Sequence, residues 1–332
     1  MSITSAGSLI GSVIALTAAT AVTAEVPRVA TDIAPVHSLV ARVMDGLGTP
    51  DLVVRAGGSP HDYSLRPSEA RALERADAVF WVGPALEPWL GGSIDTLAPE
   101  ALVVELLDAP GTVTLDFREG AVFDDHDHGD GAHGSTHDEA HETDAAHDDH
   151  DHDDDHEEHD HEGTDPHAWL DPENGKVWLD LIADELAALD PENADTYRGN
   201  AAAGRDEIDA AMADARAALS SAGEIEFVVF HDAYHYFENR FGISAAGAIS
   251  LSDASDPSPA RIEEVRDRVR DLGVACVFSE PQFNQNLVET VTEGTSARAA
   301  VIDPIGLDLE EGPGFYPALI RSVAEDIAGC AS

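Results

Sequence analysis

Residues 226–242 read EFVVFHDAYHYFENRFG, and the fold class of the whole chain follows from this stretch. Glu226 to Phe230 is a short, largely apolar run, which predicts a buried strand. His231 to Tyr234 ends that strand, and the aromatic residues that follow indicate a packed helix. A strand that leads directly into a helix is the repeating unit of α/β proteins with parallel sheets.

The same alternation of strand and helix continues outward in both directions. We expect an α/β fold with two lobes, each a parallel sheet flanked by helices. Upstream, the predicted strands cover residues 28–33, 51–55, 78–82 and 101–106. Downstream, predicted strands cover residues 243–249, 274–279 and 299–303, and predicted helices cover residues 259–272 and 319–327.

Two long helical patterns lie between the two halves, at residues 173–189 and 191–220. A helix of ~28 residues spans ~40 Å, which is long enough to run beside two lobes. We therefore predict an N-terminal lobe over residues 25–190, a linking helix over residues 191–220 and a C-terminal lobe over residues 221–332.

The first 24 residues predict an export signal, residues 1–24, that is removed from the mature chain. Leu9 to Val22 is a run of apolar and small residues, and Val22-Thr23-Ala24 is a small-x-small cleavage pattern. A buried N-terminal helix is the alternative. The run is too short and too polar for a transmembrane span, so we expect an exported mature chain without membrane insertion.

The chain has two cysteines, Cys276 and Cys330. An even pair in an exported protein suggests a disulfide, and two free buried thiols are the alternative. Closing a loop of about 54 residues would stabilise the fold by ~4 kcal/mol in the chain-entropy model. Two cysteines alone cannot form a thiolate zinc site.

The run from Asp124 to Asp165 contains 11 of the 16 histidines, 19 acidic residues and no lysine or arginine. It lacks apolar periodicity and carries dense like charge, so we predict that residues 124–165 form a disordered loop. Imidazole and carboxylate bind borderline divalent metals, which favours a set of weak metal sites. A solvated acidic spacer is the alternative. The histidines of this loop are His126, His128, His133, His137, His141, His147, His150, His152, His156, His159 and His161.

The formal net charge of the chain is −47, and it is still −28 without the 19 acids of that run. Such a surface repels phosphate, which excludes non-specific binding of nucleic acid. Two interpretations of the acidic surface remain open: it attracts cations over a long range, or it reflects a salt-exposed source.

Three of the histidines outside the run lie where a parallel α/β sheet binds ligands, at the carboxyl ends of strands or in loops. His61 follows the strand at 51–55, His231 follows the strand at 226–230, and His167 follows the acidic run. Asp303 ends the last strand. Three imidazoles and one carboxylate suit zinc better than manganese or calcium. Spacing alone is a weak signal, because four scattered residues form no local metal motif.

Other polar and aromatic residues near these positions have structural interpretations. We expect His37 to be a partly exposed structural histidine and His235 to belong to a packed aromatic helix. Glu280 is either a ligand or a structural hydrogen-bond acceptor, and Trp169 is either a core residue or part of the site wall.

Five segments of the chain, taken in order from Val26 to Ala331, resemble the metal-binding periplasmic components of zinc ABC transporters, the ZnuA type. They read GGSPHDYSLRPSEA, DPHAWLDPE, FVVFHDAYHYFENRFG, CVFSEPQFN and GTSARAAVIDPIG. The resemblance implies two α/β lobes joined by one long rigid helix, with the metal in the interlobe cleft. It implies His61, His167 and His231 as ligands and matches Asp303 to an acidic position that completes the site in related proteins.

The chain departs from the family pattern at Pro60, where some zinc members have a glutamate. Asp303 or a water must therefore fill the fourth ligand position. Manganese members carry a glutamate where this chain has His231, so the nitrogen there favours zinc. The positions of Cys276 and Cys330 also match a family disulfide.

The resemblance implies a monomeric periplasmic receptor that delivers Zn²⁺ to the membrane permease of a zinc ABC importer, without catalysis. Two alternatives remain open at this point. One is a zinc hydrolase that uses Glu280 as a base, and the other is a metal buffer that acts through the histidine-rich run alone.

Overall fold

The computed structural model describes residues 25–118, 123, 163–250, 257–283 and 285–331. The predicted export signal and all eleven histidines of the predicted metal-collecting loop lie outside these described residues. No helix among the described residues is long and apolar enough to cross a membrane.

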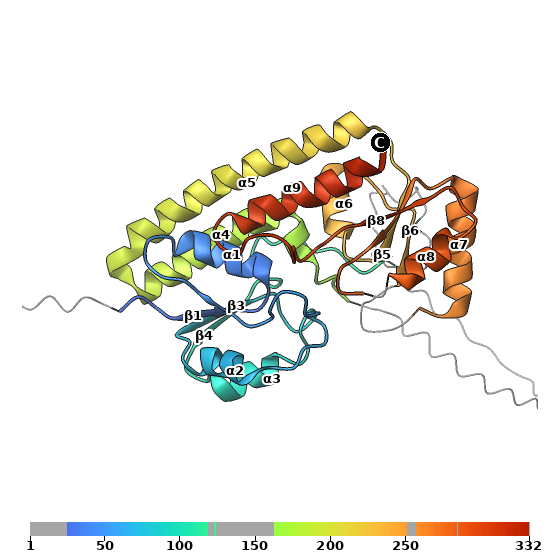
Figure 1. Ribbon diagram of the computed structural model, residues 1–332. Helices are drawn as coiled ribbons and strands as arrows, with labels where there is room; N and C mark the ends of the chain where they lie inside the picture. The colour runs from blue at the N-terminus through green and yellow to red at the C-terminus, as the bar shows by residue number, and fades with distance from the viewer. Residues whose placement is uncertain (1–24, 119–122, 124–162, 251–256, 284, 332) are drawn as a thin grey trace, which may run out of the picture.

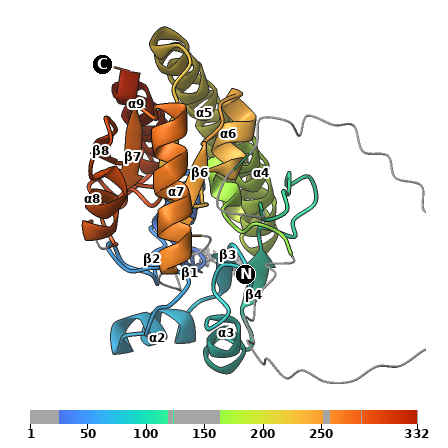
Figure 2. The ribbon, with the colours of Figure 1, turned by 90° about the vertical axis from the view of Figure 1, so that its right-hand side faces the viewer.

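The N-terminal lobe contains a parallel sheet of four strands in the order β2-β1-β3-β4. Its strands are β1 (Val29–Thr31), β2 (Asp51–Leu52), β3 (Ala78–Trp81) and β4 (Leu102–Glu105). Its helices are α1 (Ala34–Val43), α2 (Pro67–Glu74) and α3 (Gly91–Leu97). Figures 1 and 2 show α2 and α3 on the side of this sheet that faces away from α1 and α5. Every residue of β1 and β3 is buried, because helices cover both faces.

The C-terminal lobe repeats this plan, with a parallel sheet in the order β6-β5-β7-β8. Its strands are β5 (Phe227–His231), β6 (Gly247–Ser250), β7 (Cys276–Ser279) and β8 (Arg298–Val301). Its helices are α6 (His235–Phe241), α7 (Pro259–Leu272) and α8 (Asn286–Thr292). The predicted fold class, two α/β lobes with parallel sheets and flanking helices, is confirmed.

A layer of three long helices joins the lobes: α4 (Pro172–Leu189), α5 (Ala194–Ala222) and α9 (Phe315–Ala328). The 29 residues of α5 span ~43 Å, and Figure 1 shows this helix running along both lobes. The predicted linking helix begins as a 3-10 turn, η2 (Pro191–Asn193), before α5 starts. Two further 3-10 turns, η1 (Ala168–Leu170) and η3 (Gly329–Ala331), precede α4 and follow α9.

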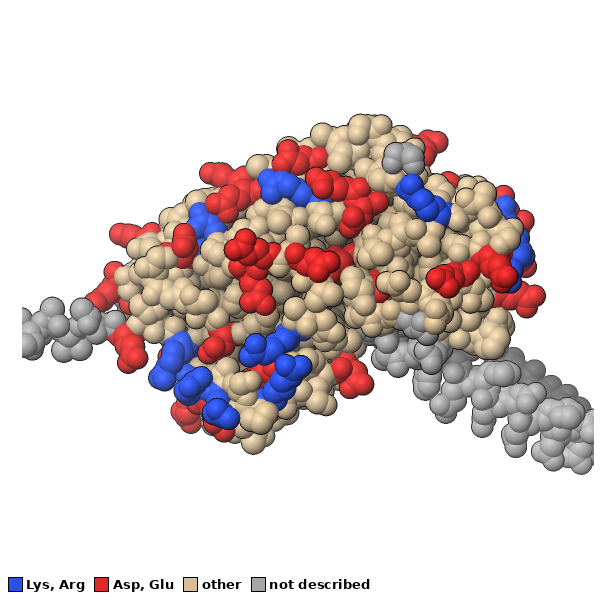
Figure 3. Space-filling model, in the orientation of Figure 1, with Lys and Arg blue, Asp and Glu red and all other residues tan. Residues whose placement is uncertain are grey.

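Ion pairs attach α5 to its neighbours. Glu207 of α5 pairs with an arginine of α1 at 3.1 Å, Arg205 with an aspartate of α4 at 2.6 Å, and Asp214 with an arginine of α9 at 2.8 Å. The pairs are exposed to solvent on at least one side, and each contributes little alone. Figure 3 shows acidic side chains spread along the part of this face formed by the long helices, while many of the basic ones gather over the N-terminal lobe below.

The hydrophobic core is shared between the lobes. One cluster of buried side chains runs from Val29 of β1 to Cys330 after α9. Close packing of α9 on α4 depends on Gly175, where an added Cβ would lie 2.5 Å from the hydroxyl oxygen of Tyr316. That hydroxyl donates to the carbonyl of Trp169 at 2.7 Å, directly before α4.

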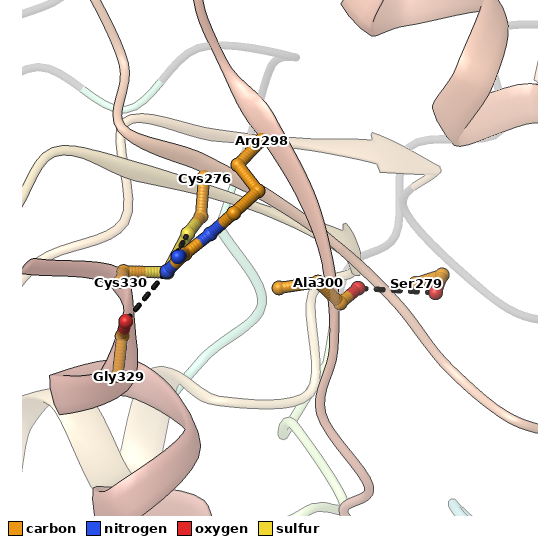
Figure 4. Close-up of a disulfide and its surroundings, with 6 residues drawn as sticks. All are labelled: Cys276, Ser279, Arg298, Ala300, Gly329 and Cys330. Carbon is orange, nitrogen blue, oxygen red and sulfur yellow. Dashed lines mark hydrogen bonds between the residues drawn. A yellow bond between two sulfur atoms is a disulfide. The ribbon is translucent and has the colours of Figure 1, made fainter. Parts of the chain in front are cut away.

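The predicted disulfide is confirmed. Cys276 at the start of β7 is bonded to Cys330, with the two Cα atoms 5.8 Å apart. Figure 4 shows the side chain of Arg298 beside the bond, where its guanidinium donates to the carbonyl of Gly329. The disulfide therefore fixes the segment after α9 to the start of β7, an inner strand of the C-terminal sheet.

Two expectations need correction. The end of the predicted disordered loop 124–165 is wrong, because Gly163 to Asp165 is part of the fold. Thr164 forms an antiparallel bridge with Asp116, and Asp165 is 1% exposed. Backbone hydrogen bonds to a preceding segment hold these residues in place. The second correction concerns His37, which is buried rather than partly exposed and donates from Nε2 to the carbonyl of Pro50 at 3.1 Å.

Candidate metal centre

Three histidines from separate segments meet at one point. The nitrogen atoms that His61, His167 and His231 offer as ligands all lie within 4.8 Å of one another. These three residues are the one cluster of at least three histidine, cysteine or acidic side chains, among the described residues, that could hold a metal ion. Zn–N bonds of about 2.0 to 2.1 Å in a tetrahedral shell need nitrogens about 3.4 Å apart.

The fold explains why these side chains converge. His231 is the last residue of β5, and strand ends of a parallel sheet form the ligand-binding edge. His61 lies in the loop between β2 and α2, and His167 lies immediately before η1. The His167 ring centroid is 5.4 Å from that of His61 and 5.2 Å from that of His231. The site is thus built from both lobes.

Two of the imidazoles are oriented by carboxylates. The Nδ1 atom of His167 lies 2.7 Å from Oδ1 of Asp165, and the Nδ1 atom of His231 lies 2.6 Å from Oε1 of Glu280. A neutral imidazole that donates its Nδ1–H to a carboxylate has its lone pair on Nε2, which is the arrangement that a metal ligand needs. The two carboxylates therefore set the tautomer and direction of both rings.

Both of these carboxyl groups are shielded from solvent, which disfavours their charged form. Asp165 is 1% exposed and Glu280 is 0% exposed. Burial raises the pKa of Asp165 to about 7, and the hydrogen bond from the backbone N–H of His167 opposes that rise. A buried carboxylate next to a histidine becomes more favourable when a cation binds on the far side of the ring.

A partly buried arginine ties the segment after β4 to the chain next to His231. The guanidinium of Arg118 donates to both carboxylate oxygens of Asp232 and to Glu238 of α6. Burial alone would lower the pKa of Arg118, but the charges of Glu238 and Asp232 raise it above its ordinary value. Arg118 also lies 3.8 Å over the ring of Phe123. This cluster fixes the backbone immediately after His231, a candidate ligand.

Aromatic rings form part of the wall of the site. Phe283 lies edge-on to His231, with ring centroids 5.5 Å apart, and Trp169 lies 5.3 Å from His167. The indole N–H of Trp169 donates to the carbonyl of Pro304 at 2.9 Å. Trp169 is 1% exposed and belongs to the shared core, and it also contacts His167, so both of its sequence interpretations hold. Its hydrogen bond to Pro304 also links the two lobes.

The other candidate positions lie outside the group of three histidines. Asp303 uses its carboxylate in the turn after β8, where Oδ1 accepts the N–H groups of Ile305 and Gly306 at 3.0 and 2.9 Å and Oδ2 accepts that of Leu307. His235 begins α6, and its Nδ1 atom lies 3.9 Å from Oδ2 of Asp165.

Sequence reasoning missed Asp165 and Arg118 as parts of this centre. Asp165 was assigned to the acidic run by its composition, although its position two residues before His167 was a usable signal. Arg118 lies 114 residues before Asp232, so no local pattern connects the two.

Comparisons with known proteins show which family the chain belongs to. Residues 29–330 match the family model described as zinc-uptake complex component A, periplasmic. The chain is 47% identical over 305 residues to the high-affinity zinc uptake system protein ZnuA of Brucella suis, covering 92% of this chain and 91% of that protein. It is 44% identical over 315 residues to the protein of the same name from Paracoccus denitrificans, covering 95% and 94%.

Solved structures show the same fold at lower sequence identity. A crystal structure of ZnuA matches with a TM-score of 0.69 and 21% identity, covering 92% of this chain and 100% of that one. The solute-binding protein FpvC of Pseudomonas aeruginosa, in complex with Mn²⁺, matches with a TM-score of 0.72 and 21% identity, covering 92% and 98%. By its family model and its relatives, the chain belongs to the ZnuA family of periplasmic zinc-uptake components, which are transport binding proteins and not enzymes.

Proposed function

We propose that this protein is a periplasmic receptor that binds Zn²⁺ between its lobes through His61, His167 and His231. The observation that carries the proposal is the convergence of these three side chains within 4.8 Å. Imidazole nitrogens in a tetrahedral shell suit zinc, whereas manganese and calcium favour oxygen-rich shells. The names of the Brucella and Paracoccus relatives support the same cargo.

The fourth ligand is a water or the carboxylate of Asp303. Water is favoured, because both carboxylate oxygens of Asp303 already accept backbone N–H groups. If the carboxylate of Asp303 left this turn to bind the metal, three backbone N–H groups would lose their hydrogen-bond acceptor, which costs free energy. The Asp303→Asn variant should therefore bind zinc about as tightly as the wild type.

Membership of the ZnuA family supports delivery of the ion to the membrane permease of a zinc ABC importer. In this proposal the mature chain is an exported monomer, the signal peptide at residues 1–24 is removed, and the histidine-rich loop collects metal for the cleft. A hydrolase is less consistent with the site, because Glu280 contacts Nδ1 of His231. That contact suits an orienting group rather than a general base acting on a metal-bound water.

The test is calorimetric zinc titration of a variant that lacks residues 124–162. The deletion must stop there, since Asp165 contacts His167. One tight site is expected, and His231→Ala in the same background should abolish it. Absence of a tight site after the deletion would show that the cleft assignment is wrong.

A growth experiment separates the receptor from a metal buffer. A receptor without residues 124–162 should support partial growth in zinc-poor medium, whereas His231→Ala in the full chain should not. The reverse pattern would favour the buffer that acts through the loop.

A further inference from the structure

The burial and the surroundings of His61 differ from those of the other two histidines of the candidate metal centre. His167 and His231 are buried, at 4% and 3% exposure, and each contacts a buried carboxylate. His61 is only partly buried and lies in a loop with two consecutive glycines. Gly57 has a φ of +82°, a conformation that favours glycine. Such a loop needs an external contact to hold a ligand in place.

That contact comes from Trp89. Its indole Nε1–H donates to the carbonyl oxygen of Pro60 at 2.7 Å, and Pro60 directly precedes His61. Because Pro60 fixes its own φ angle, holding its carbonyl restricts the backbone at His61. The ring of Tyr63, on the other side of His61, lies 5.8 Å from the Trp89 ring. Trp89 therefore contacts the loop on both sides of the histidine.

The loop is further shaped around Tyr63. The Tyr63 hydroxyl donates to Oε1 of Glu69 at 3.0 Å, and Glu69 is 1% exposed. An added Cβ on Gly58 would lie 2.7 Å from the Tyr63 ring, so this close approach requires glycine.

Trp89 itself sits on a firmly anchored segment. The loop after β3 contains Leu86, Glu87 and Leu90, each 0% exposed. Backbone N–H groups of Leu86 and Glu87 donate to the carbonyl of Gly83 at 3.1 Å. The carboxyl group of Glu87 lies beside that of Asp32, which follows β1 and accepts the N–H of Val82. These contacts hold the segment that carries Trp89 in a fixed position relative to the sheet.

We propose that Trp89 is the positioning residue for His61, and that its hydrogen bond to the Pro60 carbonyl holds this ligand ready for the ion. The inference rests on the proposed role of His61 in binding zinc. Trp89 does not need to contact the metal. It reduces the conformational freedom that the loop would otherwise lose when zinc binds, and so strengthens binding.

The test uses Trp89→Phe, which keeps a smaller aromatic ring against Tyr63 and removes the N–H donor together with part of the indole ring. The matched control is Trp178→Phe, which removes a similar bond, from the buried indole N–H to Oγ1 of Thr112 at 3.0 Å, in the helical core. Both variants are made in the full chain. Zinc affinity and release rate are measured against a chelator strong enough to keep weaker sites empty.

Losing one net hydrogen bond predicts about three- to tenfold weaker zinc binding and faster release for Trp89→Phe. Amide exchange of residues 57–64 in the zinc-free protein should also become faster. Trp178→Phe should change none of these three quantities, even if it lowers the melting temperature as much as Trp89→Phe does.

Two results overturn the inference. If the wild type binds zinc tightly and Trp89→Phe matches it in affinity, release rate and amide exchange, only the positioning role fails. If the wild type itself has no tight zinc site under these conditions, the proposed function fails and the positioning role fails with it.

Discussion

The contact between Glu280 and His231 gives the sharpest prediction for zinc affinity. Removing a carboxylate that orients a metal-binding histidine typically weakens metal binding by about 10- to 100-fold, or about 1.4 to 2.7 kcal/mol. Two features place Glu280 at the upper end of this range. The carboxylate is 0% exposed, and its distance of 2.6 Å to Nδ1 indicates a charge-assisted hydrogen bond.

We therefore expect Glu280→Ala to bind zinc about 100-fold more weakly than the wild type. Glu280→Gln keeps an oxygen that accepts the imidazole N–H but loses the charge, so a loss of about tenfold is expected. Affinity is measured by competition with a chelator, and unfolding by urea in the same samples separates binding from stability.

The matched control is Asp190→Asn. Asp190 is also a buried carboxylate, and its Oδ2 accepts hydrogen bonds from Tyr197 and Asn193 at 3.0 and 2.7 Å, at the corner between α4 and α5. This variant should lose stability and keep its zinc affinity. Glu280→Ala with an affinity within about threefold of the wild type would refute the orienting role.

Three further predictions concern the stability of the zinc-free protein, measured by urea unfolding. Replacing Cys276 and Cys330 with serine should lower the free energy of unfolding by ~4 kcal/mol, because the disulfide closes a loop of 54 residues; a loss below ~1 kcal/mol would contradict the chain-entropy account. Gly175→Ala should cost about 1 to 3 kcal/mol, because its Cβ would displace the tyrosine hydroxyl of α9; a neutral effect would mean that α9 shifts freely. Burial and the charge of Asp32 raise the pKa of Glu87 well above its usual range. Stability from a carboxyl group with a raised folded pKa is complete below its unfolded pKa and is lost as the pH rises toward the folded value. The wild type should therefore lose more stability than Glu87→Gln between about pH 5 and about pH 8, and equal losses would show that Glu87 does not hold its proton.

The sequence was sufficient for the parallel α/β architecture because strand and helix periodicities alternate clearly along it. Helix α7 shows why some boundaries are also predictable. Ser258 caps its first turn through Oγ, and Gly273 ends it with a φ of 64°. Strand β6 shows the limit. The apolar run predicts residues 243–249, but ladder pairing with β5 yields Gly247–Ser250. Where pairing begins depends on the neighbouring strand, which local sequence does not contain.

The candidate ligands could be predicted from the sequence, whereas most of the residues that support them could not. His61, His167 and His231 carry side chains with distinctive chemistry, and each lies in a segment that resembles the ZnuA family. Their partners are ordinary acidic and basic residues whose roles arise only from burial. Glu280 was correctly given as a possible hydrogen-bond acceptor, whereas Asp165 was hidden within a run of similar charge. Tertiary contact distinguishes it from its neighbours, and composition cannot.

The packing of α9 has a consequence for how the molecule is made. The last helix of the chain completes the cluster that includes the first strand, so residues more than 280 positions apart must meet before the core closes. Such long-range contacts make folding slow and late. We therefore expect the shared core, which holds residues of both β1 and α9, to close only once α9 has packed. The order of these packing steps is set by the topology of the fold rather than by local sequence.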